Sequence, residues 1–204
     1  MAKLLLATRN EGKVRELAAM LAGFEIEVLS LAAFPHLPEV IEDAADFAGN
    51  AAKKALAAAA GSGLAALADD SGLVVDALDG EPGLYSARYG GPGLSDAERC
   101  ELLLTRLAAR GRSASPARFV CAMALARPGG LAASCQAQWP GTVRGPRRGD
   151  RGFGYDPIFE PADAVGTAAT LDPELKNRLS HRGQALAEMA RMVARRPELL
   201  NPEG

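Results

Sequence analysis

Polar residues that directly follow the first apolar segment combine a predicted helix start with positive charge: Thr8, Arg9, Asn10, Glu11, Gly12 and Lys13. Asn10 is a favourable helix N-cap, and the backbone N–H groups at a helix start carry a partial positive charge. Lys13 adds a full charge within the first turn. Such a helix start predicts a phosphate-binding site. The alternative is a capped helix with a solvated lysine.

Two adjacent carboxylates, Asp69 and Asp70, lie between two apolar segments and are followed by Ser71 and Gly72. Carboxylates in such a place can hold Mg²⁺ or orient a catalytic water. Adjacent side chains on a strand point to opposite faces, so we expect at most one of the two to face a site. The alternative is an ordinary Asp-Ser-Gly turn between two strands.

A glycine-rich segment in the second half of the chain contains Gly152, Phe153, Gly154, Tyr155 and Asp156. The two glycines permit a close approach of the backbone to a flat ligand. Phe153 can stack on a nucleobase. The alternative is a loop whose aromatic side chains fill the core.

Positive charge also gathers where the last helix is expected to begin. Ser180 is a suitable N-cap, which places His181 and Arg182 in the first turn, where cations oppose the helix dipole. Lys176 precedes them. A position that breaks a local rule is a candidate for function, and an anionic or carbonyl-bearing ligand would remove the conflict. The alternative is ordinary surface charge.

Together the four segments supply cationic sites, carboxylates and an aromatic slot, which suit Mg²⁺-dependent chemistry on a nucleoside polyphosphate. With only two histidines, a multi-histidine metal site is excluded, so a bound metal would need oxygen ligands, as Mg²⁺ does. The chain has no GxxxxGKS/T motif of a Walker-type NTPase. It also lacks the GxGxxG fingerprint of dinucleotide-binding folds.

The elements that must position these residues alternate between strand and helix. Apolar runs predict strands at 3–8, 25–29, 117–126 and 131–139, and two strands separated by a turn within 64–78. Helical spacing and composition predict helices after Asn10, at 46–61, at 95–110, and from Ser180 to about Arg195. This order predicts an α/β or mixed α+β fold, as one domain over residues 1–204, with a central mixed sheet.

Composition limits the class of protein. The chain has 204 residues, of which 48% are hydrophobic and 24% charged, and this excludes a disordered chain. A net charge of −2 argues against binding nucleic acid by bulk electrostatics, and no apolar run is long enough to cross a membrane. Three cysteines without a CxxC motif, Cys100, Cys121 and Cys135, indicate reduced thiols and a cytoplasmic location.

Six segments that span nearly the whole chain make the sequence similar to a known family: LATRNEGKVREL, FAGNAAKKA, ADDSGLVVDALDGEPGLYSARY, ARFVCAMAL, GFGYDPIF and LSHRGQAL. It resembles the inosine triphosphate pyrophosphatase family, in particular its bacterial dITP/XTP pyrophosphatases. The resemblance implies a long mixed sheet whose flanking helices form two lobes around a substrate cleft. It also implies a cytoplasmic homodimer that hydrolyses ITP, dITP and XTP to the monophosphate and pyrophosphate with Mg²⁺, clearing deaminated purines.

The resemblance further implies roles for individual residues. Thr8, Asn10 and Lys13 match a triphosphate-binding TxNxxK pattern that also includes Arg9, Glu11 and Gly12. Asp70 matches the catalytic carboxylate, with Asp69 as a second candidate for activating water, and Ser71 matches a substrate contact. Glu42 matches an acidic position that would hold Mg²⁺ together with Asp70. Base and phosphate contacts are implied for Phe153, Gly154, Tyr155, Asp156, Lys176, His181 and Arg182.

Two departures from the family pattern leave alternatives open. Gly49 stands where the family often has Glu, so Glu39 or Asp43 could replace Glu42 beside the metal. The segment 148–151 reads RGDR where the family usually has Gly and Thr. Other hypotheses are a pyrophosphatase for pyrimidine or modified nucleotides, a nucleotide sensor without turnover, which has no need of a catalytic carboxylate, and a structural domain, which leaves the charged start of the last helix unexplained.

Overall fold

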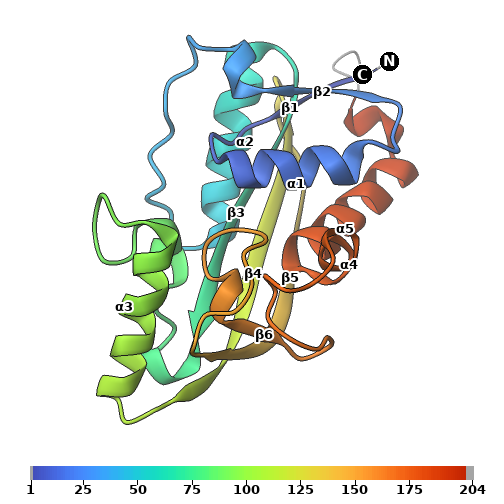
Figure 1. Ribbon diagram of the computed structural model, residues 1–204. Helices are drawn as coiled ribbons and strands as arrows, with labels where there is room; N and C mark the ends of the chain where they lie inside the picture. Colours follow the sequence, from blue (N-terminus) through green and yellow to red (C-terminus); the bar gives the residue numbers. More distant parts are fainter. Residues whose placement is uncertain (1, 201–204) are drawn as a thin grey trace. The chain divides into compact units, whose positions relative to one another are not determined.

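The computed structural model describes residues 2–200 (Figure 1). Six strands form one sheet in the order β2-β1-β3-β4-β5-β6. Their bounds are β1 Ala2–Leu6, β2 Ile26–Ser30, β3 Ala65–Val75, β4 Ala114–Arg127, β5 Gly130–Arg144 and β6 Phe159–Pro161. β1 pairs in parallel with both β2 and β3, whereas β5 and β6 are antiparallel. The predicted mixed sheet in an α/β chain is therefore confirmed.

Five α-helices accompany the sheet over residues 2–200: α1 Glu11–Leu21, α2 Phe47–Ser62, α3 Asp96–Ala109, α4 Pro173–Leu179 and α5 His181–Arg195. Asn10 caps α1 and accepts from the Lys13 backbone N–H, as its residue type predicts. Ser95 and Glu98 form a complete capping box at the start of α3. The short strand β6 and the short helix α4 are absent from the sequence-based prediction.

The prediction of a turn between two strands at 64–78 is wrong. β3 runs without interruption from Ala65 to Val75 and carries Asp69 and Asp70 in its middle. The Asp-Ser-Gly signal reflects the usual cost of placing carboxylates inside a sheet. That cost is offset because each carboxylate is paired with a cation in this structure.

The described residues divide into two compact units, between which the chain crosses four times. Unit 1 comprises 2–70, 121–137 and 182–200, and unit 2 comprises 71–120 and 138–181. The single domain expected over residues 1–204 stays a prediction.

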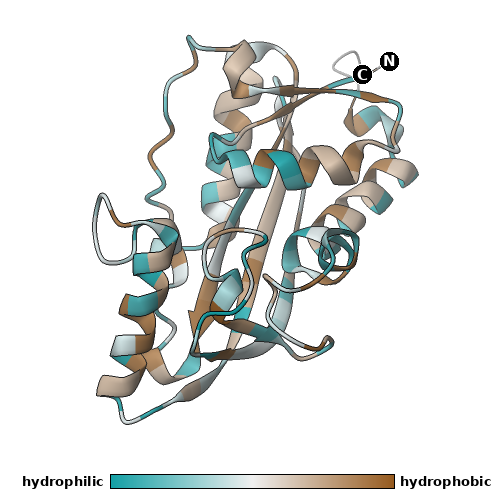
Figure 2. Cartoon of the chain, in the orientation of Figure 1, coloured by the Kyte–Doolittle hydropathy of each residue, from teal (hydrophilic) through white to brown (hydrophobic). Residues whose placement is uncertain are grey.

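The sheet strands of unit 1 are largely hydrophobic (Figure 2), and their two faces carry side chains of different size. The leucine face carries Leu4, Leu6, Leu67, Met123 and Leu125, and packs against α1 and α5. The alanine face carries Leu5, Ala66, Ala68, Ala122, Ala124 and Ala126, and packs against Ala51, Ala55, Ala58 and Ala59 of α2. The alternation along β3 and β4 follows the two-residue period of a strand.

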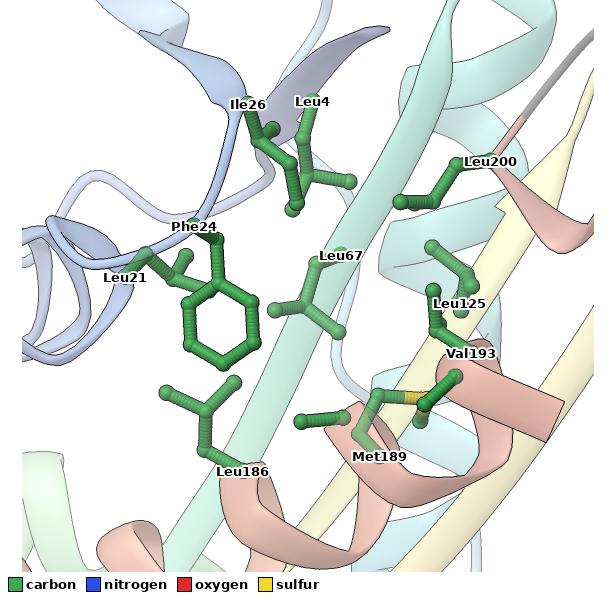
Figure 3. Close-up of a pocket in the computed structure, with 12 residues that line it drawn as sticks. Leu4, Leu21, Phe24, Ile26, Leu67, Leu125, Leu186, Met189, Val193 and Leu200 are labelled. Atoms are coloured by element: carbon green, nitrogen blue, oxygen red, sulfur yellow. The ribbon is translucent and has the colours of Figure 1, made fainter. Parts of the chain in front are cut away.

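The leucine face contains an apolar cavity of about 130 Å³ (Figure 3). Leu21 of α1, Leu186 and Met189 of α5, and Leu67 of β3 line it together with Phe24. The cavity thus lies among large apolar side chains, whereas the opposite face is formed mainly by alanines.

Unit 2 has its own core around aromatic side chains. Phe159 packs edge-on against Phe119, with ring centroids 4.6 Å apart, and lies 5.4 Å from Trp139. The indole N–H of Trp139 donates to Asp163 Oδ1 at 2.8 Å, which satisfies its buried donor. This core anchors the segment after β5.

All three cysteines are present as thiols, and Cys121 is buried in the core. Burial raises the pKa of Cys100 to about 12 and that of Cys135 to about 11, so both stay protonated near neutral pH. Between residues 2 and 200, no helix combines the length and the apolar character that a membrane span needs.

Candidate active site

The adjacent carboxylates of β3 point to opposite faces of the sheet in unit 1. Asp70 shares the alanine face with Ala66 and Ala68 and contacts α2, whereas Asp69 shares the leucine face with Leu67 and contacts α1 and α5. This geometry follows from the pleat of a strand and confirms the expected divergence of the two side chains.

On the alanine face, α2 supplies two donors to Asp70. Asn50 Nδ2 donates to Asp70 Oδ2 at 2.9 Å, and Lys54 Nζ lies 3.6 Å from Asp70 Oδ1. Lys54 also donates to Glu42 Oε1 at 2.8 Å. Asn50 and Lys54 are four residues apart, so they lie on one side of the helix. Glu42 and Asp70 therefore converge on one ammonium group.

Electrostatics keep Lys54 charged in this cluster. Burial disfavours the ammonium form, but the negative charges of Asp70, Asp69 and Glu42 outweigh burial, so the pKa of Lys54 is raised. The cluster therefore contains a permanent cation at physiological pH.

On the leucine face, Asp69 lies in a buried network of charges. Lys13 Nζ is 3.0 Å from Asp69 Oδ2, and the Nε and Nη2 atoms of Arg182 lie 3.4 Å from the same oxygen. Arg182 also pairs with Glu16. Burial disfavours its charge, but Asp69 and Glu16 raise the pKa of Arg182 above its ordinary value. These carboxylates offset the conflict between Arg182 and the start of α5 without any ligand.

The start of α1 is held in place by its own polar side chains. Thr8 Oγ1 accepts from the Asn10 N–H at 3.2 Å, and Asn10 Oδ1 accepts from the Lys13 N–H at 3.1 Å. Arg9 donates to the Leu37 carbonyl at 3.0 Å. Glu11 is exposed, and Gly12 is buried. The structure thus brings Lys13 to Asp69, while Glu11 points to solvent beside Arg15.

In unit 2, the predicted base-binding segment forms a loop with internal ties. Asp156 Oδ2 accepts from the Phe153 N–H at 2.9 Å and from Lys176 Nζ at 2.7 Å. Lys176 Nζ also lies 5.4 Å from the centroid of the Phe153 ring, within cation–π range. Phe153 is half-buried, whereas Asp156 is buried. Asp156 therefore holds the backbone of Phe153, and Lys176 contacts its ring.

Two further contacts fix the same loop. The Gly154 N–H donates to Asp96 Oδ2 at 2.6 Å, and Tyr155 donates from its hydroxyl to the Ser86 carbonyl at 3.0 Å. Burial raises the pKa of Tyr155 above its ordinary value. Tyr155 belongs to the core of unit 2, as the alternative hypothesis for this segment expects.

The remaining predicted site residues of unit 2 are His181 and Ser71. The ring of His181 is buried and stacks on Phe119, with centroids 4.7 Å apart and an interplanar angle of 8°. Ser71 is half-buried in β3, directly after Asp70. Ser71 thus lies within the strand that carries the two carboxylates, and His181 is the first residue of α5.

Sequence reasoning missed Glu16, Asn50 and Lys54. Helical spacing could have found two of them, because Asn50 and Lys54 are one turn apart on a helix that otherwise presents alanines to the core. A buried polar residue on an alanine face signals a specific partner. Glu16 follows Lys13 by three residues on α1, so the two share a face.

The carboxylates in unit 1 fit a hard metal ion with oxygen ligands. Within the described part of the chain, no group of three or more His, Cys, Asp or Glu side chains is arranged around a metal position. Mg²⁺ is commonly held by one or two carboxylates together with substrate phosphates, so Glu42 and Asp70 suffice. Asp43 instead pairs with Lys53 at the surface, and this contact lowers the pKa of Asp43.

Comparisons with known proteins identify the family to which the chain is similar. A model of the Ham1 family matches residues 4–192. The chain is 50% identical over 187 residues to a dITP/XTP pyrophosphatase of Geobacter sulfurreducens, covering 92% of this chain and 94% of the relative. It is 49% identical over 186 residues to a dITP/XTP pyrophosphatase of Desulfotalea psychrophila, covering 91% and 82%.

A solved structure extends the agreement from sequence to fold. The structure of a HAM1 protein from Coxiella burnetii aligns with a TM-score of 0.86 and 39% identity, covering 96% of this chain and 100% of that one. The resemblance seen in the six sequence segments is thereby confirmed. On sequence and fold together, the chain belongs to the Ham1 family.

Proposed function

We propose that this chain hydrolyses non-standard purine nucleoside triphosphates (dITP, XTP and ITP) to the monophosphate and pyrophosphate. The observation that carries the proposal is Asp70, a strand carboxylate that Asn50 and Lys54 hold beside Glu42. Relatives with about half of their residues in common are named dITP/XTP pyrophosphatases, which supports the same activity for this chain.

In the proposed reaction, Asp70 accepts a proton from the water that attacks the α-phosphorus. The new bond forms between the water oxygen and that phosphorus, and the bond to the pyrophosphate oxygen breaks. We assign this role to Asp70 rather than Asp69 because Asp69 has no exposed side-chain surface and binds Lys13 and Arg182. The side chain of Asp70 keeps 8% of its surface exposed.

Glu42 and Asp70 would hold Mg²⁺, since their carboxylates already converge on one cationic group, the Lys54 ammonium. When bound, the metal would neutralise charge on the polyphosphate. Lys13 and the backbone N–H groups at the start of α1 would bind the phosphates, with Thr8 and Asn10 fixing that backbone. Each of these protein groups is held in place before substrate arrives, which favours catalysis.

Base recognition is assigned to the loop that contains Phe153, supported by Asp156 and Lys176. Phe153 would stack on the purine, and a donor at the base edge would meet the 6-keto oxygen. Adenine presents an amino group at that position, and a buried donor left unpaired costs roughly 1–3 kcal/mol. That mismatch accounts for the selection against adenine. Guanine also carries a 6-keto oxygen, so its exclusion requires a group that senses its 2-amino substituent.

We also propose that the enzyme works in the cytoplasm as a homodimer, without a nucleic-acid or membrane partner. Thiol cysteines and a net charge of −2 support the location and the lack of a polyanion partner. The dimer rests on the family resemblance, and gel filtration with light scattering would test it.

A turnover panel with Mg²⁺ tests the proposed activity. Purified protein is given dITP, XTP, dGTP, ATP and dTTP, and pyrophosphate and orthophosphate are measured separately. We expect fast pyrophosphate release from dITP and XTP, and slow release from the other three. Orthophosphate as the product would place the attack at the terminal phosphorus and contradict the proposal. Turnover of dTTP in preference to dITP would favour a pyrimidine-specific enzyme, and binding without turnover would favour a sensor.

A further inference from the structure

Asn50 is a buried polar residue in the first turn of α2, the helix that packs against the alanine face. Only 1% of its surface is exposed, and its neighbours on the inner side of α2 are Ala51 and Ala55. A buried amide among alanines costs free energy unless its donors and acceptor are paired. We therefore expect the polar atoms of the Asn50 side chain to have specific hydrogen-bond partners.

Both ends of the Asn50 amide are engaged with residues beside the proposed reaction centre. Its Nδ2 donates to Asp70 Oδ2 at 2.9 Å, and its Oδ1 accepts from the Ala44 N–H at 2.9 Å. Only one orientation of the amide satisfies both neighbours, because a backbone N–H must donate and a carboxylate must accept. The hydrogen-bond network thus determines the orientation of the side chain.

Each oxygen of Asp70 consequently has its own donor on α2. Asn50 binds Oδ2, and Lys54 lies near Oδ1, so rotation of the carboxylate would break one contact or both. Asn50 orients the Asp70 carboxylate without adding charge, whereas Lys54 adds a positive charge beside it. A neutral donor can hold a carboxylate in place without adding a second cation next to it.

The other end of Asn50 holds the chain segment that carries Glu42. Ala44 lies two residues after Glu42, in a stretch without regular secondary structure. A single side chain therefore ties this loop and the central strand β3 to the same turn of α2. The two carboxylates of the proposed Mg²⁺ site come from these two segments.

We propose that Asn50 is a positioning residue, which sets the orientation of Asp70 and the place of the Glu42 loop for the reaction. The inference rests on the proposed function, since it concerns how that site is arranged. Residues that orient metal-binding or reacting groups typically change activity by about 10–100-fold when they are removed. The expected effect falls on kcat, because Asn50 is buried and contacts the proposed general base, Asp70.

Two substitutions separate the two contacts of Asn50. Asn50→Ala removes both. Asn50→Asp keeps an oxygen that can accept from the Ala44 N–H, but it replaces the donor to Asp70 with an acceptor. Ser62→Ala is the matched control, because it removes a hydrogen bond to the Ala58 carbonyl from the same helix, away from Asp70.

Steady-state kinetics with dITP supply the first measurement. We expect kcat to fall about 10–100-fold in Asn50→Ala and at least as much in Asn50→Asp, with KM within about threefold of the original value. Ser62→Ala should leave both constants unchanged. If Asn50→Asp keeps nearly full kcat while Asn50→Ala loses it, Asn50 acts only through the Glu42 loop, and its proposed role in orienting Asp70 is overturned. Full kcat in Asn50→Ala, or an effect on KM alone, also overturns it.

Amide hydrogen exchange by NMR supplies a measurement that does not depend on activity. Protection of the Ala44 N–H should be lost in Asn50→Ala and kept in Asn50→Asp. Loss of protection throughout the molecule in Asn50→Ala would indicate unfolding, and the decision then rests on kcat of Asn50→Asp. If the original protein turns over no nucleotide, the proposed function fails first, and the role of Asn50 fails with it. If the original protein is active and the variants equal it, only the role of Asn50 fails.

Discussion

Asp69 and Asp70 are chemically identical neighbours on one strand, yet the two faces of the sheet give them different surroundings. Asp69 points to the leucine face, where Lys13 and Arg182 reach it from α1 and α5. Asp70 points to the alanine face, where Asn50 and Lys54 reach it from α2. The comparison distinguishes a carboxylate that stabilises the fold, Asp69, from a carboxylate that we propose to react with substrate, Asp70.

Side-chain size explains why the two faces use different partners. Small alanines on both α2 and the strands let helix and sheet approach closely, so even the short side chain of Asn50 reaches Asp70. On the leucine face, large side chains separate α1 and α5 from the strands, and the long side chains of Lys13 and Arg182 make the contact with Asp69. The apolar cavity lined by Leu67 and Met189 lies on this face (Figure 3).

The charges on the two faces also differ. Asp69 has no exposed side-chain surface and belongs to a set of two cations and two carboxylates in which Arg182 is also buried and Lys13 and Glu16 are partly buried. Removing one member of such a set leaves an uncompensated charge in the interior. Asp70 retains some exposure, next to a half-buried Glu42. We therefore expect Asp69 to control stability and Asp70 to control turnover.

The largest expected effect follows from Asp70→Asn. The amide keeps the size of the side chain but cannot accept a proton from water, and the loss of a general base typically lowers the rate by about 10²–10⁴-fold. Pyrophosphate release from dITP measures kcat, and urea unfolding measures stability. We expect kcat to fall by that factor and the free energy of unfolding to change little. Near-normal turnover would show that Asp70 is not the general base, and the two carboxylates would then not differ in function as we propose.

The next effect in size follows from Asp69→Ala. Lys13 and Arg182 would lose their shared carboxylate, and breaking a buried ion network costs about 3–5 kcal/mol of the free energy of unfolding. Urea denaturation with a check of the m-value measures this change. The matched control is Asp76→Ala, which removes an exposed pair with Arg118 at 3.1 Å. That pair should contribute less than about 1 kcal/mol. Equal losses in the two variants would show that burial does not distinguish Asp69.

Much of the fold, together with the helix cap at Asn10 and the divergence of the two carboxylates, could be predicted from the sequence, because these features depend on local signals. Periodicity located β1, β2 and the helices α1, α2 and α3, and the cap at Asn10 was identified from residue type alone. The divergence of Asp69 and Asp70 followed from the pleat of a strand. These are properties of a few consecutive residues, so no knowledge of distant contacts was needed.

The errors came from contacts between residues far apart in sequence. A turn was predicted at Asp69-Asp70 because two carboxylates inside a strand are unfavourable without partners, and the partners come from α1, α2 and α5. The roles of Asn50 and Lys54 depend on a strand more than fifteen residues away. The charge of Arg182 suggested a ligand, whereas the structure supplies Asp69 and Glu16. Single-sequence reasoning finds unusual residues more readily than it finds their partners.

The smallest expected effects come from adding the same side chain to each face. Ala59→Leu inserts three carbons into the tightly packed contact between α2 and the sheet, where Ala59 has no exposed surface, and should cost about 1–3 kcal/mol. Ala190→Leu extends the same group into the apolar cavity on the other face and should leave stability unchanged or raise it by about 0.5–2 kcal/mol. Both substitutions replace alanine in a helix with another good helix former, so propensity contributes little to the difference. Thermal and urea unfolding of the two variants would measure the difference in their free energies of unfolding. If Ala190→Leu costs as much as Ala59→Leu, the two faces are packed equally well, and side-chain size no longer explains why a short amide reaches Asp70 while long cations are needed to reach Asp69.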